Sequence, residues 1–282
     1  MSDAAARTLS LGFSPCPNDT FIFYALVHGA LAQRQISFSE RLLDVEALNA
    51  LVLAGELDIS KVSYHLLGHV LDRYCLLRSG GALGRGCGPL LVSRSHLPLE
   101  GLAGKSVAIP GIYTTAALLL RLFEPRITRL VVLPFHEIMA AVAAGTVDAG
   151  VIIHESRFTF QQFGLTKLVD LGSWWEEETG KPIPLGGIVA RRDLGRETIG
   201  EVERLVRESL VYSRRHPAEA HAYIRSHAQE MSDEVCASHI DLYVNRFSED
   251  VGAEGEEAIE VLFERAEREG LIPPRRSSLF VA

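Results

Sequence analysis

Short apolar runs alternate with longer segments of helical periodicity over the first two-thirds of the chain. Leu9, Leu11 and Phe13 fall on one face of a strand expected over residues 8–13, because alternate side chains of a strand point the same way. Further strands are expected over residues 36–43, 105–109, 130–133, 147–153 and 168–171. The helices expected beside them cover residues 20–32, 45–54, 114–123 and 135–144. Such alternation is typical of an α/β fold whose parallel-rich sheets are covered by helices.

The last third of the chain changes to an almost entirely helical pattern, and two glycine-rich stretches interrupt the chain. The expected helices cover residues 197–215, 217–226, 233–246 and 254–269. The stretch 80–88 and the pair Gly186-Gly187 indicate turns where the chain crosses between two bodies. The spacing in 80–88 is not that of a nucleotide-binding loop. The predicted lobes are residues 1–104 with 188–282, the larger and discontinuous one, and residues 105–187, the smaller one.

One short motif occurs twice. The sequence AGELD of residues 54–58 recurs as AGTVD in residues 144–148, each time after an expected helix and before an apolar strand. In this register Tyr64 is equivalent to His154. A helix–Gly–strand turn is common in any α/β protein. It is also what two related lobes would produce, each presenting the end of an equivalent strand to a shared ligand cleft.

Composition and charge narrow the functional classes. The chain has 282 residues, 47% hydrophobic and 23% charged, which is enough apolar material for two cores. The formal net charge of −8 argues against nucleic acid or an anionic membrane as a partner, since phosphate backbones are held by clustered Lys and Arg. A local site for a small anion is compatible with this charge.

Targeting signals and cysteine spacing bear on the compartment. The N-terminal residues lack the basic and apolar regions of a signal peptide, and no apolar run approaches the roughly 20 residues of a membrane span. We therefore expect a cytoplasmic protein. The cysteines have no C-x-x-C spacing, which predicts reduced thiols rather than disulfides or a zinc site. They are Cys16, Cys75, Cys87 and Cys236.

His154 is the strongest candidate for chemistry. It follows the apolar run Val151-Ile152-Ile153, and a side chain at the carboxyl end of such a strand faces a ligand site rather than the core. Its imidazole can accept a proton near neutral pH. A hydrogen-bonded structural histidine is an equally good interpretation of the residue type alone. The following Glu155 does not make a zincin helix, because the motif fails at Phe158.

Two other segments could contact a ligand. Thr114 and Thr115 open an expected helix, where backbone amides and the helix dipole favour a carboxylate or phosphate, although threonine is also an ordinary helix cap. Lys61 and Ser63 could supply a cation and a hydroxyl from the first lobe. Lys61 could equally be a solvated charge at a strand end.

Three further features have simpler interpretations. His65 and His69 have the i, i+4 spacing of a metal pair, but no third ligand stands out, and we expect no metal. Cys16 could be imagined as a nucleophile, yet its two flanking prolines suggest that it shapes a turn. Trp174-Trp175 is followed by acidic residues and could form a lid or a packing element, with a solvated loop as the simpler view.

Four blocks together resemble the 1,4-dihydroxy-6-naphthoate synthases of the futalosine route to menaquinone. They are GFSPCPNDTF at 12–21, RSGGALGRG at 78–86, IIHESRF at 152–158, and LG with WWE at 171–176. The similarity runs from about residue 9 to residue 281 and is far more specific than any single motif.

The resemblance implies a two-lobed α/β fold like the type II periplasmic binding proteins, with the ligand cleft between the lobes. It implies that the general base of the family falls on His154. It also implies that the substrate-contacting segments fall on Lys61, Val62 and Ser63 and on Thr114, Thr115 and Ala116. The middle of the first segment is a plain apolar residue.

The implied reaction converts cyclic dehypoxanthine futalosine to 1,4-dihydroxy-6-naphthoate. His154 would remove a proton and start a fragmentation that releases the sugar-derived part, and aromatisation of the remaining ring would drive it, so no cofactor is expected. The substrate carries a carboxylate, which suits the helix N-terminus, and hydroxyls, which suit Lys61 and Ser63. Two alternatives share the fold: a solute-binding protein, disfavoured by the missing signal peptide, and the sister enzyme chorismate dehydratase.

Overall fold

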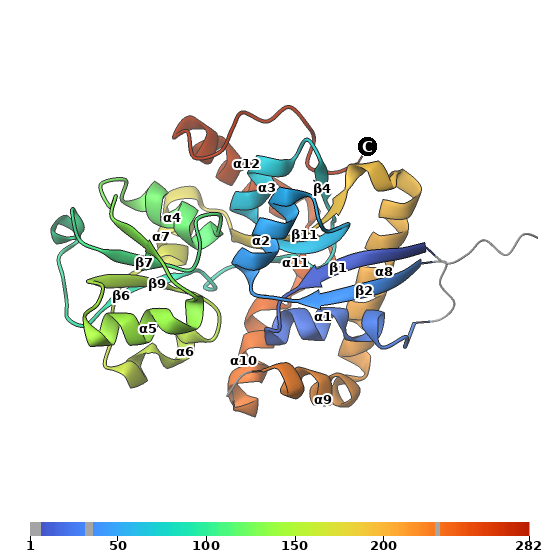
Figure 1. The fold of residues 1–282 in the computed structure, drawn as a ribbon, viewed down its shortest axis with the longest axis horizontal. Helices are drawn as coiled ribbons and strands as arrows, with labels where there is room; N and C mark the ends of the chain where they lie inside the picture. Colours follow the sequence, from blue (N-terminus) through green and yellow to red (C-terminus); the bar gives the residue numbers. More distant parts are fainter. Residues whose placement is uncertain (1–6, 32–35, 229–231, 282) are drawn as a thin grey trace, which may run out of the picture. The chain divides into compact units, whose positions relative to one another are not determined.

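The chain divides into two compact units in the computed structural model, which describes residues 7–31, 36–228 and 232–281 (Figure 1). Unit 1 consists of Met1–Ala82, Gly186–Gly252 and Arg275–Ala282. Unit 2 consists of Leu83–Leu185 and Ala253–Pro274. Each unit has its own mixed sheet with helices packed against it, so the expectation of an α/β fold is confirmed.

The sheet of unit 1 has the strand order β2-β1-β3-β11-β4, with β5 paired to β11. Its strands are β1 (Arg7–Phe13), β2 (Ile36–Leu42), β3 (Ile59–Ser63), β4 (Tyr74–Leu76), β5 (Ala82–Gly84) and β11 (Ile183–Arg191). β5 after Ala82 and β11 before Gly186 belong to unit 2, so these two strands mark where the chain passes between the units. β1 runs parallel to both β2 and β3, whereas β11 is antiparallel to β3. The carboxyl ends of β1, β2 and β3 therefore meet at one edge of this sheet.

Helices pack on both faces of this sheet. The helices of unit 1 are α1 (Pro17–Val27), α2 (Val45–Ala54), α3 (Tyr64–Val70), α8 (Arg196–Arg215), α9 (Pro217–His227), α10 (Asp233–Tyr243) and α11 (Arg246–Glu249). The face of β1 that carries Leu9, Leu11 and Phe13 forms a buried cluster with apolar residues of α1, α8 and α9. On the other face, α2 packs so closely that a Cβ at Gly12 would lie 2.7 Å from Leu48 Cδ2.

The sheet of unit 2 has the strand order β10-β6-β9-β7-β8. Its strands are β6 (Leu90–Ser93), β7 (Val107–Ile109), β8 (Leu130–Val132), β9 (Ala149–Ile152) and β10 (Thr166–Asp170). β7 is parallel to β8 and β9, and β6 is antiparallel to β9 and β10. As in unit 1, three parallel strands present their carboxyl ends at one edge.

Helix α5 covers one face of this sheet. The helices of unit 2 are α4 (Thr115–Phe123), α5 (Phe135–Ala144), the short α6 (Ser156–Thr159), α7 (Leu171–Thr179) and α12 (Gly252–Arg268). Ile138 and Val142 of α5 belong to the core cluster of this unit, and a Cβ at Gly150 of β9 would lie 2.5 Å from Ile138 Cγ2. α4 contacts α7, where the rings of Phe123 and Trp174 pack edge to face at 5.3 Å.

The repeated AGELD and AGTVD motifs lie at equivalent places in the two sheets. Gly55 and Gly145 end α2 and α5 with left-handed backbone (φ 81° and 77°). Asp58 Oδ2 accepts hydrogen bonds from the backbone N and Oγ of Ser10, each at 2.9 Å. Asp148 Oδ2 accepts the same pair from Ser106, each at 2.8 Å. We call this pair of hydrogen bonds from a serine to an aspartate the Ser–Asp clasp. Its presence in both units, together with the equivalent strand order, supports the interpretation that the two units are related.

The sequence-based lobe boundaries differ from the structural division in two places. β6 falls within the predicted lobe 1–104 but pairs with strands of unit 2, and α12 falls within the predicted segment 188–282 but belongs to unit 2. Both assignments depend on contacts between segments far apart in the chain, which local periodicity does not contain. The return of the chain to unit 1 at Gly186 coincides with the predicted second crossing.

Candidate functional site

In unit 1, the predicted substrate segment 61–63 lies at the carboxyl end of β3, beside the turn that follows the parallel strand β1. Ligands of open α/β sheets bind at this edge. The turn after β1 and the first turn of α1 contribute Ser14, Asn18 and Asp19, while β3 contributes Lys61. Lys61 was predicted from the sequence as a ligand-contacting residue, whereas no role was predicted for Asn18 and Asp19.

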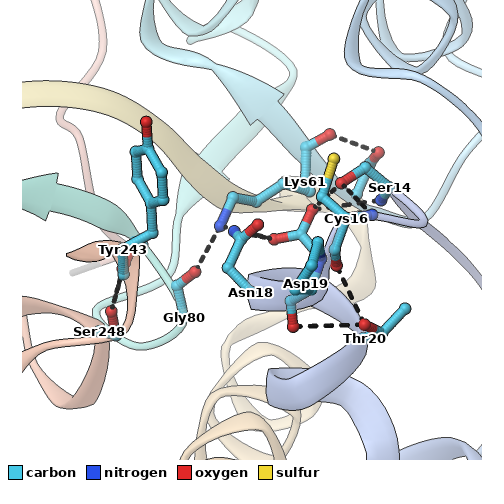
Figure 2. Close-up of polar contacts among 12 residues, drawn as sticks. Ser14, Cys16, Asn18, Asp19, Thr20, Lys61, Gly80, Tyr243 and Ser248 are labelled. Atoms are coloured by element: carbon cyan, nitrogen blue, oxygen red, sulfur yellow. Dashed lines mark hydrogen bonds and ion pairs between the residues drawn. The ribbon is translucent and has the colours of Figure 1, made fainter. Parts of the chain in front are cut away.

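Lys61 is buried and ion-paired. Its side chain is 6% exposed, and its Nζ lies 3.2 Å from Asp19 Oδ1, which is 3% exposed (Figure 2). The ammonium also donates a hydrogen bond of 2.8 Å to the carbonyl oxygen of Gly80. The alternative of a solvated charge at the strand end is therefore wrong. The Asp19 carboxylate compensates the desolvation of the buried ammonium.

Asp19 is the centre of this polar cluster. Its Oδ2 accepts hydrogen bonds from the backbone N of Ser14 at 3.2 Å and from Ser14 Oγ at 2.7 Å. Its Oδ1 accepts one from Asn18 Nδ2 at 2.9 Å, in addition to the Lys61 contact. Hydrogen-bond donors reach both oxygens and the Lys61 cation lies on Oδ1, so Asp19 and Lys61 form a hydrogen-bonded ion pair.

Two glycines shape the other side of the Lys61 ammonium. Gly80 has a left-handed φ of 83°, and a Cβ there would lie 2.1 Å from Ile188 Cδ1, so glycine is required on both counts. A Cβ at Gly186 of β11 would lie 3.5 Å from Lys61 Cε. The glycine-rich stretches that the sequence associated with chain crossings therefore also border the lysine.

Val62 and Ser63, the rest of this predicted segment, are fixed within unit 1. Ser63 donates its backbone N–H to Asn49 Oδ1 at 3.0 Å, and Asn49 Nδ2 donates to Ser63 Oγ at 3.3 Å. Val62 is fully buried and is paired with Gly187 of β11. The structure thus brings Lys61 together with Asp19, and Ser63 together with Asn49.

His154 lies just beyond the carboxyl end of β9 in unit 2. Its φ of 56° makes it the one non-glycine residue with left-handed backbone in the described part of the chain. This conformation costs an ordinary residue about 1–2 kcal/mol, and such outliers cluster at functional sites. The imidazole is partly exposed and packs edge to face against Phe135, with 5.3 Å between ring centroids.

The second predicted segment opens α4. Thr114 is the N-cap: its Oγ1 accepts from Ala117 N at 3.2 Å and donates to Gly111 O at 2.8 Å. Thr115 Oγ1 donates to Leu185 O at 2.6 Å. Both threonine side chains and Ala116 are buried, so capping, which the sequence gave as one interpretation, is confirmed for Thr114. The helix still directs the positive end of its dipole beyond its N-terminus.

His154 and the start of α4 lie at the same edge of the unit 2 sheet. β7 leads into α4, β9 leads to His154, and these two strands are adjacent and parallel. Phe135 begins α5 after β8, the parallel neighbour of β7 on its other side. Sequence reasoning missed Phe135, because only the strand order shows that it lies near His154.

The structure also locates two other candidate features. The rings of His65 and His69 lie 5.4 Å apart, but no group of three potential metal ligands occurs among the described residues. Cys16 is buried, and its carbonyl accepts the backbone N–H groups of Asp19 and Thr20, which fits the expected role in shaping the turn.

The acidic and aromatic segment is not the solvated loop that the sequence suggested. Trp174 and Trp175 lie on α7, and Trp175 is fully buried with its Nε1 donating to Pro182 O at 3.3 Å.

None of the helices in the described part of the chain combines the length and apolar character that crossing a membrane requires.

Comparison with solved structures defines the class of fold. The alkanesulfonate-binding protein from Xanthomonas axonopodis superposes with a TM-score of 0.70 at 16% identity, over 95% of this chain and 94% of that one. The chain therefore has a fold like the periplasmic binding proteins, as the resemblance implied. A crystal structure of an Archaeoglobus fulgidus protein is more similar, with a TM-score of 0.89 and 34% identity over 94% of this chain and 98% of that one.

Sequence comparison identifies the family. A family profile described as menaquinone biosynthesis matches residues 9–268, and the chain belongs to this family. It is 54% identical to a 1,4-dihydroxy-6-naphthoate synthase of Thermus thermophilus over 98% of this chain and the whole of that protein. It is 47% identical to a synthase of the same name from Streptomyces coelicolor, over 95% of this chain and 96% of that one.

Proposed function

We propose that this chain is a 1,4-dihydroxy-6-naphthoate synthase that forms its product from cyclic dehypoxanthine futalosine in menaquinone biosynthesis. The observation that carries the proposal is the identity to two synthases over nearly the full length of all three chains. The sequence identity to the Thermus protein is 54%, far above the identity that a common fold alone requires. The proposed place of action is the cytoplasm, and the proposed partner is a small molecule with a carboxylate and sugar-derived hydroxyls.

His154 is the proposed general base. Support comes from its place at the carboxyl end of β9, its partly exposed ring and its left-handed backbone. The imidazole would take a proton from the substrate, and the electron pair left behind would break the bond to the sugar-derived part. Ring aromatisation then makes the step favourable. Protons and electrons stay within the substrate and the base, so we expect no cofactor.

Lys61, Val62 and Ser63 form the first proposed substrate segment. The two acceptors of the Lys61 ammonium account for two of its three N–H donors, and the third would bind a substrate oxygen. Ser63 would offer its hydroxyl, whose position is supported by Asn49. Val62 would belong to the segment through its backbone.

Thr114, Thr115 and Ala116 form the second proposed substrate segment. The carboxylate of the substrate would sit against the first turn of α4, where backbone amides and the helix dipole favour an anion. The bonds of the two threonine hydroxyls to Gly111 and Leu185 hold this turn in place. Since the hydroxyls already have protein partners, the backbone is the better candidate for the anion contact.

The deciding experiment is incubation of the purified protein with cyclic dehypoxanthine futalosine, followed by mass spectrometry. We expect 1,4-dihydroxy-6-naphthoate together with the released sugar-derived fragment. A parallel incubation with chorismate tests the sister enzyme. Tight binding of the first compound without conversion, by protein whose circular dichroism shows it to be folded, would favour the solute-binding alternative and overturn the proposal.

A further inference from the structure

The helical segment α10–α11 is connected to Lys61, although neither the sequence nor the family resemblance linked them. The two acceptors of the Lys61 ammonium are Asp19 Oδ1 at 3.2 Å and Gly80 O at 2.8 Å (Figure 2). Each acceptor is in turn attached to this segment by hydrogen bonds. The hydrogen bonds of this segment therefore constrain both acceptors, and through them the position of the Lys61 ammonium.

The first attachment runs from His239 of α10 through Asn18. His239 is fully buried, and its Nε2 lies 2.9 Å from Asn18 Oδ1, a contact across 221 positions of sequence. The amide orientation follows from chemistry: the Asp19 carboxylate only accepts, so Asn18 must direct its Nδ2 to Asp19 and its Oδ1 to the histidine. His239 Nε2 must then carry a hydrogen and donate.

The second attachment runs from Ser248 of α11 to the glycine loop. Gly80 N donates to Ser248 O at 2.7 Å, and Ser248 Oγ donates to Gly81 O at 2.8 Å. These bonds hold the peptide whose carbonyl oxygen, that of Gly80, accepts from Lys61. Figure 2 shows this last bond between Gly80 and Lys61. The loop that accepts from the lysine is thus held by α11.

We propose that His239 is a positioning residue for the Lys61 ammonium, acting through Asn18 and Asp19. A lysine has a flexible four-carbon stem, and two fixed acceptors select one direction for its remaining N–H donor. Without the His239 bond, Asn18 can turn, Asp19 loses a constraint, and the ammonium is less well aligned. Small misplacements of a binding group weaken alignment of the substrate. The inference rests on the proposed function in one respect, namely that Lys61 contacts substrate.

His239→Leu and His239→Gln separate positioning from packing. Leucine fills similar space without a donor, whereas the glutamine amide can place an N–H near the position of Nε2. Cys236→Ala is the matched control, because Cys236 is another buried residue on α10. We expect kcat/KM to fall about tenfold in the leucine variant, as for one lost buried hydrogen bond, and to recover most of that loss in the glutamine variant.

Two further readouts make the test decisive. In the Lys61→Met background, His239→Leu should cause no further fall in single-turnover rate, since the group it positions is gone. In unliganded protein, the NMR signal of the Lys61 ammonium, assigned by its loss in Lys61→Met, should shift in His239→Leu, return in His239→Gln and stay unchanged in Cys236→Ala. This signal does not depend on the proposed reaction.

The outcomes are distinct. A folded His239→Leu protein whose kcat/KM and Lys61 signal match the wild type would overturn the positioning role. Equal activity losses in His239→Leu and Cys236→Ala would also overturn it, in favour of a purely structural role. A wild-type protein that fails to convert the substrate would instead remove the proposed function, and the NMR shift would still decide whether His239 positions the lysine.

Discussion

His154 differs from its counterpart in unit 1 in ways that support the role proposed for it. The equivalent position holds Tyr64, which is fully buried and begins α3 with ordinary helical backbone. Burial raises the pKa of the Tyr64 hydroxyl, so this side chain does not ionise near neutral pH. His154 has instead a partly exposed ring and a left-handed backbone. Two equivalent strand ends thus carry a packing residue in one unit and a titratable residue in the other.

Replacing His154 should remove turnover but not binding. In His154→Ala we expect kcat to fall by about 10²–10⁴-fold, the usual contribution of a positioned general base. The Kd for the substrate, measured by calorimetry, should change little, because the proposed binding groups remain. His136→Ala is the control, since His136 lies in the same unit with a side chain 60% exposed. Near-wild-type turnover in His154→Ala would remove this residue from the mechanism.

Removing the charge of only one partner of the buried Asp19–Lys61 ion pair should lower the free energy of unfolding strongly. Asp19→Asn leaves the lysine charge buried without a carboxylate, which should lower the free energy of unfolding by about 3–5 kcal/mol. The double variant Asp19→Asn with Lys61→Met should recover much of this loss, because the uncompensated charge is gone. Urea unfolding measures both variants.

An exposed pair supplies the comparison for this prediction. Asp250 and Arg207 form an ion pair whose side chains are each 46% exposed. Asp250→Asn should therefore cost no more than about 1 kcal/mol, as for other surface pairs. If Asp19→Asn is no more destabilising than Asp250→Asn, then water or a rearranged side chain compensates Lys61, and the description of the pair as a buried ion pair is wrong.

At the level of elements, local sequence signals predicted most of the fold and very little of the site. The bounds of α2 and α5 agree with expectation, because each ends at a glycine that takes the left-handed cap conformation. The expected helix over 233–246 ends at Tyr243, since Asn245 caps a new helix, α11. Short-range chemistry of this kind is readable along the chain.

The polar cluster around Lys61 was not readable in the same way. The block around Asn18 and Asp19 was visible as a distinctive sequence, but its partners come from β3 and α10. Nothing near Asp19 in sequence indicates which lysine compensates it, and nothing near His239 indicates an asparagine partner. These pairings follow from strand order and helix packing, which hydrophobic periodicity does not specify.

The Ser106–Asp148 clasp between β7 and β9 should make stability depend on acidity. Hydrogen bonds from the backbone and side chain of Ser106 lower the pKa of Asp148. The stabilisation is therefore present above the unfolded pKa of about 4 and is lost as pH falls through the lower folded value. Asp148→Asn should cost about 1 kcal/mol at neutral pH, a modest value because the side chain is 34% exposed.

Unfolding at several pH values tests this clasp. The difference between wild type and Asp148→Asn should shrink as the solution is acidified, and Ser106→Ala should raise the Asp148 pKa observed by NMR. Asp72→Asn, at a carboxylate 74% exposed, serves as control and should show no comparable difference. A difference for Asp148→Asn that is constant with pH would mean that the stabilisation does not come from the ionised carboxylate.

For the whole molecule, the assignment of α12 to unit 2 leads to a prediction that chain order alone would not give. This helix follows the last helices of unit 1 in sequence, yet Lys181 pairs with its Glu257 at 2.7 Å, and the Arg265 guanidinium lies over the buried Trp175 ring at 5.5 Å. Its buried face, which includes the fully buried Phe263, therefore belongs to unit 2 and lies beside α7.

Phe263→Ala should consequently weaken unit 2 more than unit 1. We expect a loss of about 3–5 kcal/mol for a buried phenylalanine, and native-state hydrogen exchange should show lost protection first in α7, which carries Trp175. Phe23→Ala, at a fully buried position of α1, is the matched control and should lower protection in β1 instead. Because each unit has its own core, the two variants should give opposite patterns of exchange. If Phe263→Ala lowers protection in β1 as much as in α7, then α12 stabilises the chain as a single cooperative body, and its assignment to unit 2 has no energetic counterpart.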